Sequence, residues 1–538
     1  MALLAYFAVF VLAAAHGAVG QKGFLSIDCG LEDNSGGYKD PTTGVVYVSD
    51  GPYVDAGEPH KGAADQGSGL PRAYQTLRSF PSGERNCYTL PTVAGAKYLV
   101  RVVSFYGNYD SKDGSSTLQF DLYIGVDRWT TVHADSSWLN EALFVAWASW
   151  TPVCLLKTGP ASTPFVSSVE LRTLASDLYP DLTANDSMCL AARYNMGTNI
   201  SVIRYPNDTY DQYWWQIRLG DPTLKNLSTV LPIEQAYDFS VPLPVMQTAV
   251  ETASNKTVFS VALQDKSLPK FMVYLHFADF QNSQLRQFNA SGDDQPCQYT
   301  PPYLATETVR NTDWYRAPNG LCTITLAPTA ASKLPPMLNA FEIYTLISHD
   351  SPRTFPKDFD TIMAIKFEYG LKKNWNGNPC FPTELAWDGL KCSITSGNTA
   401  RITSVDLSNS NLHGAISKNF TLLTALEYLN LSGNRLDGRI PAGPVCKNNA
   451  GSLVFSYDGH LCNTAEESTS RNMAVILAPS IVVPVIAIAV LGLGYYFLTR
   501  RRKPIISTDH PSIEHEHEHP LASRQNHSVG ALQKVENR

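Results

Sequence analysis

Short apolar runs, separated by turn-forming residues, make up most of the chain between residues 24 and 347. These runs are rich in Val, Tyr, Phe and Thr and are broken by Gly, Pro, Asn and Asp, as in YLVRVVSFYGNYD, FDLYIGV, FMVYLHFADF and LNAFEIYTL. No long amphipathic helix is expected among them. β-branched and aromatic residues bounded by turn residues are typical of strands. The pattern therefore predicts a mainly β structure for this part of the chain.

The predicted strands recur at a fixed offset. Two segment pairs lie 172 residues apart: LVRVVSF (99–105) with FMVYLHF (271–277), and VEL (169–171) with FEI (341–343). A looser match joins YVSDGPYVD, which starts at Tyr47, to YPNDTYDQYW, which starts at Tyr205. Two copies of one β-sandwich domain are therefore expected, at residues 24–176 and 189–347, each large enough to bury its own core.

A shorter period of 24 residues follows in RITSVDLSNSNLHGAISKNFTLLTALEYLNLSGNRLDGRIP. The repeated apolar positions are Val405/Leu429, Leu407/Leu431, Leu412/Leu436 and Ile416/Ile440. This period is typical of leucine-rich repeats. Asn434 is expected to bond to the turn backbone, and Ser410 stands at the same place in the first repeat. A degenerate third unit is expected to keep the 24-residue period, with Leu453 and Phe455 following Leu429 and Leu431. So few repeats need caps to bury a core, so residues 373–464 are predicted as a capped block after a linker at 348–372.

Two apolar runs indicate that the chain is targeted to a membrane. Residues 1–20 end in Ala18-Val19-Gly20 and are expected to be a signal peptide. Residues 474–498 form an uncharged run of 25 residues, which at about 1.5 Å per residue reaches roughly 37 Å. That length crosses a bilayer core of about 30 Å, and the cluster RRRK follows directly, as on the cytoplasmic side. A single-pass type I protein of the plasma membrane is predicted, with a short, disordered cytoplasmic tail at 499–538.

Cysteines and glycosylation signals agree with an extracellular location for the part before residue 474. All ten cysteines lie there, and an even number in an oxidising compartment suggests disulfides. The expected pairs are Cys380–Cys392 and Cys446–Cys462 at the two ends of the leucine-rich block, with Cys29–Cys87 as a further candidate. Asn-x-Ser/Thr sequons, each a potential glycan site, occur at Asn185, Asn199, Asn207, Asn226, Asn255, Asn289, Asn419 and Asn430.

Several motifs in the first part of the chain resemble a known family. FLSIDCG, SFYGNYD, FDLYIGVDRWTTV, RYPNDTYDQYWW, VYLHFAD and NAFEIY resemble the tandem malectin-like ectodomain of plant receptor-like kinases. The resemblance implies two jelly-roll-type β-sandwiches similar to carbohydrate-binding modules. The second copy departs from the family at 287–297, where QFNASGDDQPC stands in place of a strand like FDLYIG. The segment NWNGNPCFPTELAWDGLKC (374–392) resembles the GDPC cap of the same receptors, with Asn378 in place of Asp.

Aromatic and polar residues near one another nominate two ligand-binding regions, because aromatic rings stack on sugar faces and need polar neighbours for specificity. The candidates are Tyr106, Asn108, Tyr109, Asp110, Trp214 and Trp215. The alternative is that these rings belong to sandwich cores, which also use Tyr and Trp. The resemblance implies either a glucose disaccharide, as in animal malectin, or a secreted peptide, as in some plant relatives. The leucine-rich block is either a rigid spacer or a docking face for a co-receptor.

Several functional classes are disfavoured by the sequence. It contains no glycine-rich phosphate loop, V-A-I-K, H-R-D or D-F-G motif of a kinase, and no nucleophile elbow, zincin helix or metal-ligand cluster. The net charge of −7 gives no indication of nucleic-acid binding, which usually requires a clustered basic face. The chain is therefore expected to be neither an enzyme nor a nucleic-acid binder, with no cofactor and no metal. The tail segment HPSIEHEHEHP is interpreted as solvated linker.

The C-terminal QKVENR resembles the end of the juxtamembrane segment in receptor-like kinases. The main interpretation is a cell-surface receptor-like protein that recognises an extracellular glycan or secreted peptide and signals, or competes, through a partner receptor kinase. A second interpretation is a truncated or spliced form of a receptor serine/threonine kinase. A third is a non-signalling tether to cell-wall polysaccharide.

Overall fold

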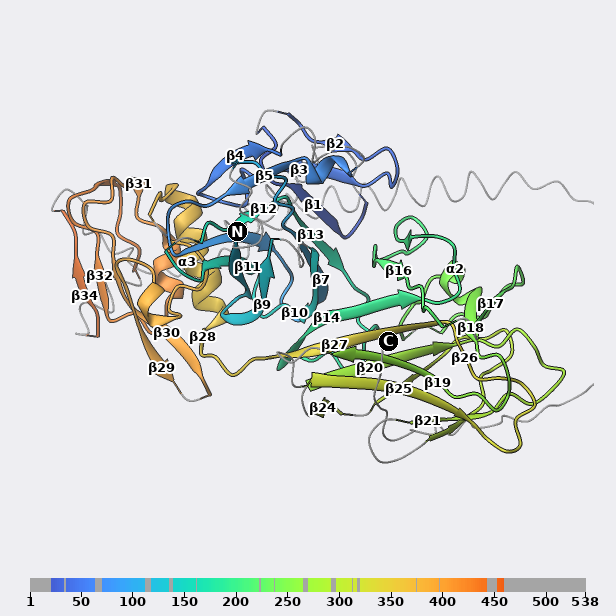
Figure 1. Ribbon diagram of the computed structural model, residues 1–538. Coiled ribbons are helices and arrows are strands. Elements are labelled where there is room, and N and C mark those ends of the chain that lie inside the picture. Colours follow the sequence, from blue (N-terminus) through green and yellow to red (C-terminus); the bar gives the residue numbers. More distant parts are fainter. Residues whose placement is uncertain are drawn as a thin grey trace, which may run out of the picture. The chain divides into compact units, whose positions relative to one another are not determined.

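The computed structural model describes residues 21–458, apart from short stretches at 33–34, 63–69, 112–117, 135–138, 161, 222–223, 237, 265–269, 292–296, 312, 317–319, 374, 396 and 443–451 (Figure 1). The predicted signal peptide, transmembrane span, tail and Cys446–Cys462 pair lie outside these residues. Within the described part of the chain, no helix is long and apolar enough to cross a membrane. Strands dominate, which confirms the mainly β prediction.

One long sheet of 13 strands runs through both predicted sandwiches. Its main order is β2 (Tyr38–Lys39), β3 (Val46–Ser49), β1 (Phe24–Asp28), β13 (Ser168–Thr173), β7 (Lys97–Val103), β10 (Leu139–Val145), β14 (Asp186–Asn195), β27 (Ala340–Ser348), β20 (Lys270–Phe277) and β23 (Glu307–Arg310), with β15 (Val202–Ile203), β16 (Trp214–Gln216) and β24 (Tyr315–Arg316) attached. The two halves join where β10 pairs with β14, through Ala142 with Cys189 and Leu143 with Met188. The main chain is therefore hydrogen-bonded across the boundary between the two copies.

A smaller sheet covers each half of the long sheet. The first consists of β6 (Arg85–Pro91), β11 (Trp150–Lys157), β8 (Gln119–Ile124) and β9 (Asp127–His133), and the second of β19 (Phe259–Gln264), β25 (Leu321–Pro328), β21 (Phe288–Ser291) and β22 (Cys297–Tyr299). In β25 the inward residues Cys322, Ile324 and Leu326 alternate with more exposed ones, as expected for a strand with one face in a core. Separate apolar clusters fill the two halves, so each copy is a sandwich.

Short elements complete the sandwiches. They are β4 (Glu58–Lys61), β5 (Thr76–Ser79), β12 (Phe165–Val166), β17 (Lys225–Ser228), β18 (Thr248–Glu251), β26 (Met337–Leu338), the 3-10 helix η1 (Arg72–Tyr74) and the short helix α2 (Leu243–Met246). The segment 287–297 departs in sequence from the family motif, but it still contributes β21 and the start of β22.

The internal repeat is visible in the strand pairing. β7 pairs with β13, and their counterparts β20 and β27 pair in the same antiparallel way. The registers differ by one residue, because Val103 faces Ser168 whereas Leu275, 172 positions later, faces Phe341. The looser match also has a structural counterpart, since Asp50 and Asp208, each three residues after the first Tyr of its segment, are both buried acid groups. The antiparallel strand pairing of the first half thus recurs in the second half, with a one-residue slip.

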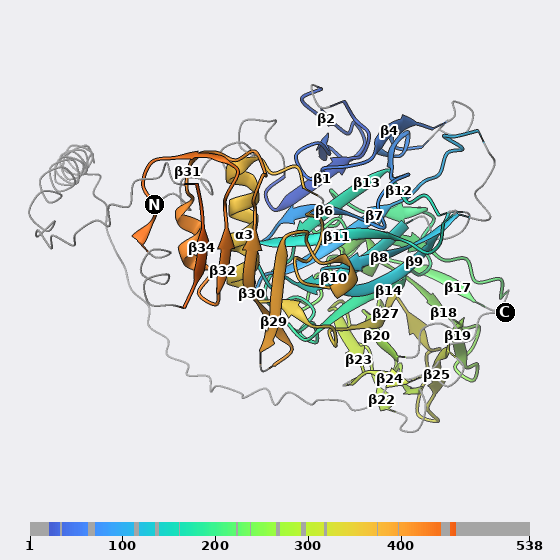
Figure 2. The same ribbon diagram turned by 90° about the vertical axis from the view of Figure 1, so that its left-hand side faces the viewer.

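The leucine-rich block forms a short parallel stack, which Figure 2 shows with β30, β32 and β34 side by side next to α3. Its elements are β28 (Arg353–Thr354), β29 (Leu390–Thr395), β30 (Thr399–Asp406), β31 (His413–Ala415), β32 (Tyr428–Asn430), β33 (Arg435–Asp437), β34 (Val454–Ser456), η3 (Thr383–Leu385) and η4 (Lys418–Leu422). Asn434 accepts hydrogen bonds from Ser410 and Leu412 and donates to Leu407 and Leu431, which confirms its predicted role.

Two expectations for this block are wrong. The third strand does not continue in step, because Leu429 pairs with Phe455, 26 residues away, rather than with Leu453. The segment predicted as a linker contains helix α3 (Pro356–Tyr369), which Gly370 ends at φ +59°, in the left-handed region that favours glycine at helix ends. Phe359, Ile362, Met363 and Ile365 of α3 are buried in the leucine-rich core, so this helix is the N-terminal cap.

Two disulfides link described cysteines. Cys380–Cys392 forms as predicted, closing the cap of the leucine-rich block. The candidate pair Cys29–Cys87 is wrong: Cys87 is joined to Cys154. These two cysteines face each other directly in the pairing of β6 with β11, whereas Cys29 is a buried thiol after β1.

Candidate functional site

The loop after β7 holds four of the predicted ligand contacts. Tyr106 is not available to a ligand, because its side chain is 5% exposed and packs against Phe165. Its hydroxyl donates to Asp110, so Tyr106 supports the loop from below. Asn108 has φ +46°, a left-handed conformation that Asn adopts more readily than most residues. The resulting turn leaves Asn108, Tyr109 and Asp110 half-buried at the surface.

Of the two candidate tyrosines in this loop, Tyr109 is the one whose ring solvent reaches. It lies 4.8 Å from the imidazole of His60 and meets the edge of Tyr106 at 5.5 Å, measured between ring centroids. His60 comes from β4 and shares a 2.9 Å hydrogen bond with Ser79. A half-exposed ring beside an imidazole and a carboxylate can stack on a sugar or pack against an apolar peptide side chain. Sequence reasoning missed His60, because no motif marks its strand.

The two predicted tryptophans have different surroundings. Trp214 is fully buried, and its indole nitrogen donates to the Oδ2 atom of Asp208 at 2.8 Å. A ligand cannot reach this ring, so the predicted ligand contact is wrong for Trp214 and the core interpretation describes it. Trp215 is half-buried, with its ring 5.7 Å from that of Tyr213. The motif RYPNDTYDQYWW therefore serves mainly the interior.

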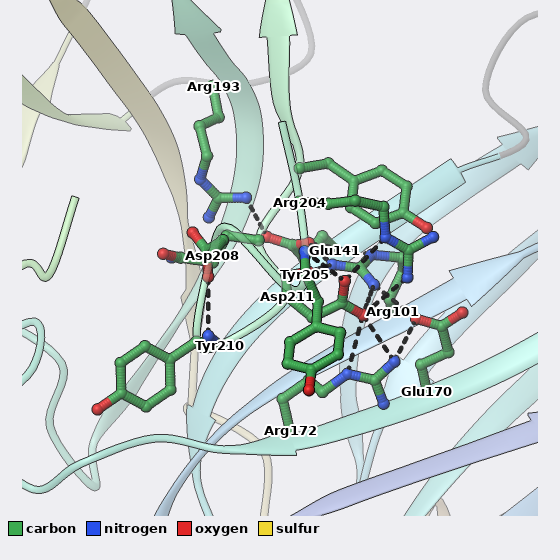
Figure 3. A network of polar contacts seen from close by, with 12 residues as sticks. Arg101, Glu141, Glu170, Arg172, Arg193, Arg204, Tyr205, Asp208, Tyr210 and Asp211 are labelled. Atoms are coloured by element: carbon green, nitrogen blue, oxygen red, sulfur yellow. Dashed lines mark hydrogen bonds and ion pairs between the residues drawn. The ribbon is translucent and has the colours of Figure 1, made fainter. Parts of the chain in front are cut away.

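That motif also delivers Asp211 to a buried group of charges between the two sandwiches, which Figure 3 shows in close-up. Arg101 of β7 lies at its centre. Its guanidinium contacts Glu141 at 2.8 Å, Glu170 at 2.5 Å and Asp211 at 3.3 Å, and all four side chains are fully buried. Tyr213 covers the guanidinium, with its ring centroid 3.9 Å from the Cζ atom. Every charge in this set has a partner of opposite sign, as buried ions require.

Asp211 connects the second sandwich to the first. It accepts from Arg172 of β13 and from Arg204 of its own loop, each at 2.8 Å. Burial by itself would raise the pKa of Asp211, but the guanidinium groups of Arg172, Arg101 and Arg204 hold that pKa well below its usual range. The carboxylate is therefore ionised at any physiological pH, and it ties the loop to two strands of the first sandwich.

Arg193 of β14 extends the group into the second sandwich. Its guanidinium contacts Glu141 at 2.5 Å and Glu342 of β27 at 2.8 Å. Burial opposes ionisation of Glu342, yet Arg193 and a hydrogen bond from His276 lower its pKa to about 2. The interdomain charge network thus balances four arginines against four carboxylates: Arg101, Arg172, Arg193 and Arg204 with Glu141, Glu170, Asp211 and Glu342.

The interdomain charge network is a connector rather than a ligand site, because seven of its eight side chains are fully buried and the eighth, Arg204, is 15% exposed. It acts together with the main-chain pairing of β10 and β14 to hold the two sandwiches as one body. A sequence signal for it exists in hindsight. Arg101, Glu170 and Glu342 are isolated charges in the otherwise uncharged strand sequences YLVRVV, SSVEL and NAFEIY, and such charges are almost never fully buried unless paired.

A second buried connector joins the first sandwich to the leucine-rich cap. Arg85 of β6 donates to the main-chain carbonyls of Asn376 (2.6 Å), Phe381 (2.7 Å) and Leu385 (2.6 Å), and more weakly to Asn378 (3.3 Å). Burial lowers the pKa of Arg85 to about 10. The carbonyls belong to the segment that resembles the GDPC cap, so this segment wraps the guanidinium of the neighbouring domain.

Further contacts widen the same joint. Trp147 lies 4.8 Å from Phe359 of α3, and Trp150 lies 5.3 Å from Phe367, measured between ring centroids. The main-chain nitrogen and the hydroxyl of Ser149 donate to Asp360 at 3.1 and 2.8 Å. The leucine-rich block is therefore packed against the first sandwich through apolar and polar contacts together.

The predicted glycosylation sites fall into two groups. Asn185, Asn199, Asn207 and Asn226 are exposed. Asn255, Asn289, Asn419 and Asn430 are half-buried, and the side-chain amides of three of them, Asn255, Asn419 and Asn430, donate hydrogen bonds within the fold. Asn430 lies on the strand face of the leucine-rich stack, where its amide bonds to Asp406 of the preceding repeat. A glycan at Asn430 would have to give up this bond.

Among the described residues, no three side chains of His, Cys, Asp or Glu are grouped so as to hold a metal. The features that the structure brings together are a half-exposed aromatic loop, two buried connectors and a short repeat stack. This arrangement suits recognition of a ligand and mechanical coupling between domains.

Comparison with known proteins agrees with this organisation. Residues 27–346 match the family model described as the malectin-like domain. Three relatives from Arabidopsis thaliana, named as LRR receptor-like serine/threonine-protein kinases, are 36%, 35% and 33% identical over 417, 447 and 539 residues. The alignments cover 76%, 79% and 93% of this chain but 47%, 50% and 61% of the relatives. The chain thus spans about half the length of the curated relatives it matches.

Solved structures share the fold. The crystal structure of the plant receptor-like kinase FER matches with a TM-score of 0.53 at 16% identity, covering 61% of this chain and 97% of FER. The structure of the plant peptide RALF23 in complex with FER and LLG2 matches with a TM-score of 0.51 at 14% identity, covering 62% of this chain and 97% of the matched one. At these identities the likeness establishes the fold alone.

Proposed function

The chain belongs to the malectin-like domain family of plant receptor-like kinases, and from this we propose that it is the extracellular sensing part of a cell-surface receptor. The observation that carries the proposal is the joint at Arg85, because it couples the sandwiches to the leucine-rich block that precedes the predicted membrane span. A ligand bound at the sandwiches would then alter the position of the whole unit relative to a neighbouring receptor.

The ligand class we favour is a secreted peptide. A peptide, RALF23, accompanies FER in one of the structures that share the fold. In this chain the half-exposed ring of Tyr109, with His60 and Asp110 beside it, supplies an apolar face with polar neighbours. The same complex also contains LLG2, so a peptide ligand is compatible with a further partner protein.

A cell-wall carbohydrate is the second candidate ligand. The same Tyr109 ring is the observation that favours it, because sugars bind proteins through stacking on exposed aromatic rings with hydrogen bonds around them. Under this alternative the protein either reports on wall polysaccharide or tethers the membrane to it. The kinase that would report either ligand belongs to a longer form of this protein or to a partner receptor.

Binding of the full chain, expressed in plant cells and purified, separates these candidates. Synthetic secreted plant peptides and wall oligosaccharides are titrated against it by calorimetry. We expect one peptide to bind saturably and Tyr109→Ala to weaken that binding, whereas Tyr123→Ala, a change to another half-exposed tyrosine on β8, leaves it unchanged. Binding of oligosaccharides alone would support the carbohydrate alternative. If neither peptides nor oligosaccharides bind, the proposed sensing function would be overturned.

A further inference from the structure

A surface pocket of about 360 Å³ lies beside the loop that carries Asp208. Three segments form its wall: residues 175–178, which link β13 to β14, the loop 207–210, and the segment that leads into α2. Polar and aromatic members of the wall are Asp177, Asn207, Thr209, Tyr210, Gln235 and Ser240. The volume is at the small end of the about 300–1,000 Å³ typical of small-molecule sites. It suits a small polar group rather than a polymer.

Asn207 and Thr209 at the pocket are the first and third residues of an Asn-x-Thr sequon. The residue between them, Asp208, points inward and is fully buried, where it accepts from the indole of Trp214 and the main-chain nitrogen of Tyr210, both at 2.8 Å. Because its central residue is anchored, the sequon cannot rotate freely. Asn207 and Thr209 are therefore held at the surface, on the pocket wall.

We propose that this pocket is the seat of the N-linked glycan on Asn207, and that it holds the innermost N-acetylglucosamine. The chemistry of that sugar fits the wall. Its apolar face can lie on the half-buried ring of Tyr210, while its hydroxyl and acetamide groups can reach Asp177, Gln235 and Ser240. Apolar wall residues such as Val241 and Leu243 would lie under the acetyl methyl group.

Covalent attachment favours this occupant over a free ligand. A group tethered at the pocket rim has an effective concentration on the order of millimolar, so a soluble sugar of weaker affinity could not displace it. The inference rests on the extracellular location proposed above, because N-glycans are added only in the secretory route. It assigns a structural role to the glycan, which would hold the chain segment 175–178 against residues 207–210, 235–236 and 240–243 of the second sandwich.

The test uses the full chain purified from plant cells, with site occupancy read by glycopeptide mass spectrometry. Glycans are then released from the folded protein by a peptide:N-glycanase, and the rates at Asn207 and Asn226 are compared. Asn226 is an exposed sequon on β17 and serves as the matched control. We expect release at Asn207 to be at least about tenfold slower, which corresponds to about 1.4 kcal/mol of protection, and the two rates to become equal after denaturation.

Variants test the bracing role separately. Thr209→Ala abolishes the sequon without touching Asn207 or Asp208, whereas Thr209→Ser keeps it. We expect amide hydrogen exchange at 175–178 and 235–243 to rise in Thr209→Ala and to stay unchanged in Thr209→Ser and in Asn226→Gln. Equal native release rates, or unmodified Asn207 in a protein whose other exposed sequons carry glycans, would overturn the inference alone. A protein without any N-glycan would overturn the extracellular location as well.

Discussion

Arg193 of β14 and Glu141 of β10 form a fully buried ion pair at 2.5 Å between strands that belong to different sandwiches. The two strands share only two directly paired positions, so side chains have to contribute to the seam. Arg193 does this from the second sandwich and Asp211 does it from the loop, because each bonds to charges of the first. The seam is therefore held by main-chain pairing and by charges that cannot exchange with solvent.

Removing Arg193 should destabilise the seam between the two sandwiches and lower the free energy of unfolding. Arg193→Met leaves Glu141 and Glu342 buried without one of their counter-charges, and breaking a buried pair in this way costs about 3–5 kcal/mol. Urea unfolding of the full chain, followed by tryptophan fluorescence, measures the loss. The control is Arg128→Met, which removes the ion pair between Arg128 and Asp121. The Arg128 side chain is 55% exposed, so this change is expected to cost no more than about 1 kcal/mol of stability. Equal losses in the two variants would show that the network adds nothing to the seam.

Asp208 should give the protein a pH-dependent stability. Burial raises the pKa of Asp208 to about 7 from the ordinary value of 3.8, although the indole of Trp214 partly offsets this. The folded protein holds this proton more tightly than the unfolded chain does. Its stabilising effect is therefore complete below about pH 4 and is lost as the pH rises to about 7, with a slope of up to about 1.4 kcal/mol per pH unit.

Asp208→Asn tests this slope, because an amide cannot titrate and the Asn207 sequon is retained. Free energies of unfolding are measured from pH 4 to pH 7 in the variant and in a control, Asp121→Asn, which changes a half-buried carboxylate on β8. We expect the variant to lose the fall in stability across this range and the control to keep it. A slope that is the same in Asp208→Asn and in the unmodified chain would assign the pH dependence to other groups.

Local pattern explains what could be predicted from the sequence. The strands around Val100 and Val273, the 24-residue repeat and the role of Asn434 all follow from side-chain spacing within one segment. The seam does not, because Arg193 meets its partners 52 and 149 positions away, and spacing carries no information about such distances. Helix α3 escaped prediction for another reason. It is a single short helix, and its apolar residues face a repeat core that exists only after folding.

The candidate site was predictable to a smaller extent. The loop around Tyr109 was identified by its composition, but composition cannot tell Tyr109 from Tyr106. Both rings lie near Phe165, at 6.0 and 5.6 Å between centroids, and only that of Tyr106 is buried. Trp214 illustrates the same limit, because its ring is buried and its indole nitrogen donates to Asp208, a member of the same motif. His60 reaches the loop from a different strand, and only the structure brings the two together.

Arg85 should be needed for docking of the leucine-rich cap. Arg85→Met leaves carbonyl groups of the cap segment without their donor, and each buried polar group left unsatisfied costs about 1–3 kcal/mol. Arg85→Lys should rescue this only in part, because an ammonium group lacks the planar fork of donors. Hydrogen exchange of the segment 376–392 is the readout, and we expect it to rise in Arg85→Met, less so in Arg85→Lys. Arg435→Met, an exposed change on β33, is the control; a matching rise there would argue against a specific joint.

The cysteine pairing can be settled chemically. Cys87 and Cys154 face each other on β6 and β11 and are 67 positions apart, so on the chain-entropy model their disulfide stabilises the first sandwich by about 4 kcal/mol. Peptide mapping under non-reducing conditions should recover Cys87 linked to Cys154 and Cys380 linked to Cys392. Replacing both Cys87 and Cys154 by alanine should lower the unfolding midpoint markedly, whereas Cys29→Ala should leave the disulfide map unchanged. A peptide joining Cys29 to Cys87 would contradict this pairing, because Cys87 cannot be bonded to both Cys29 and Cys154.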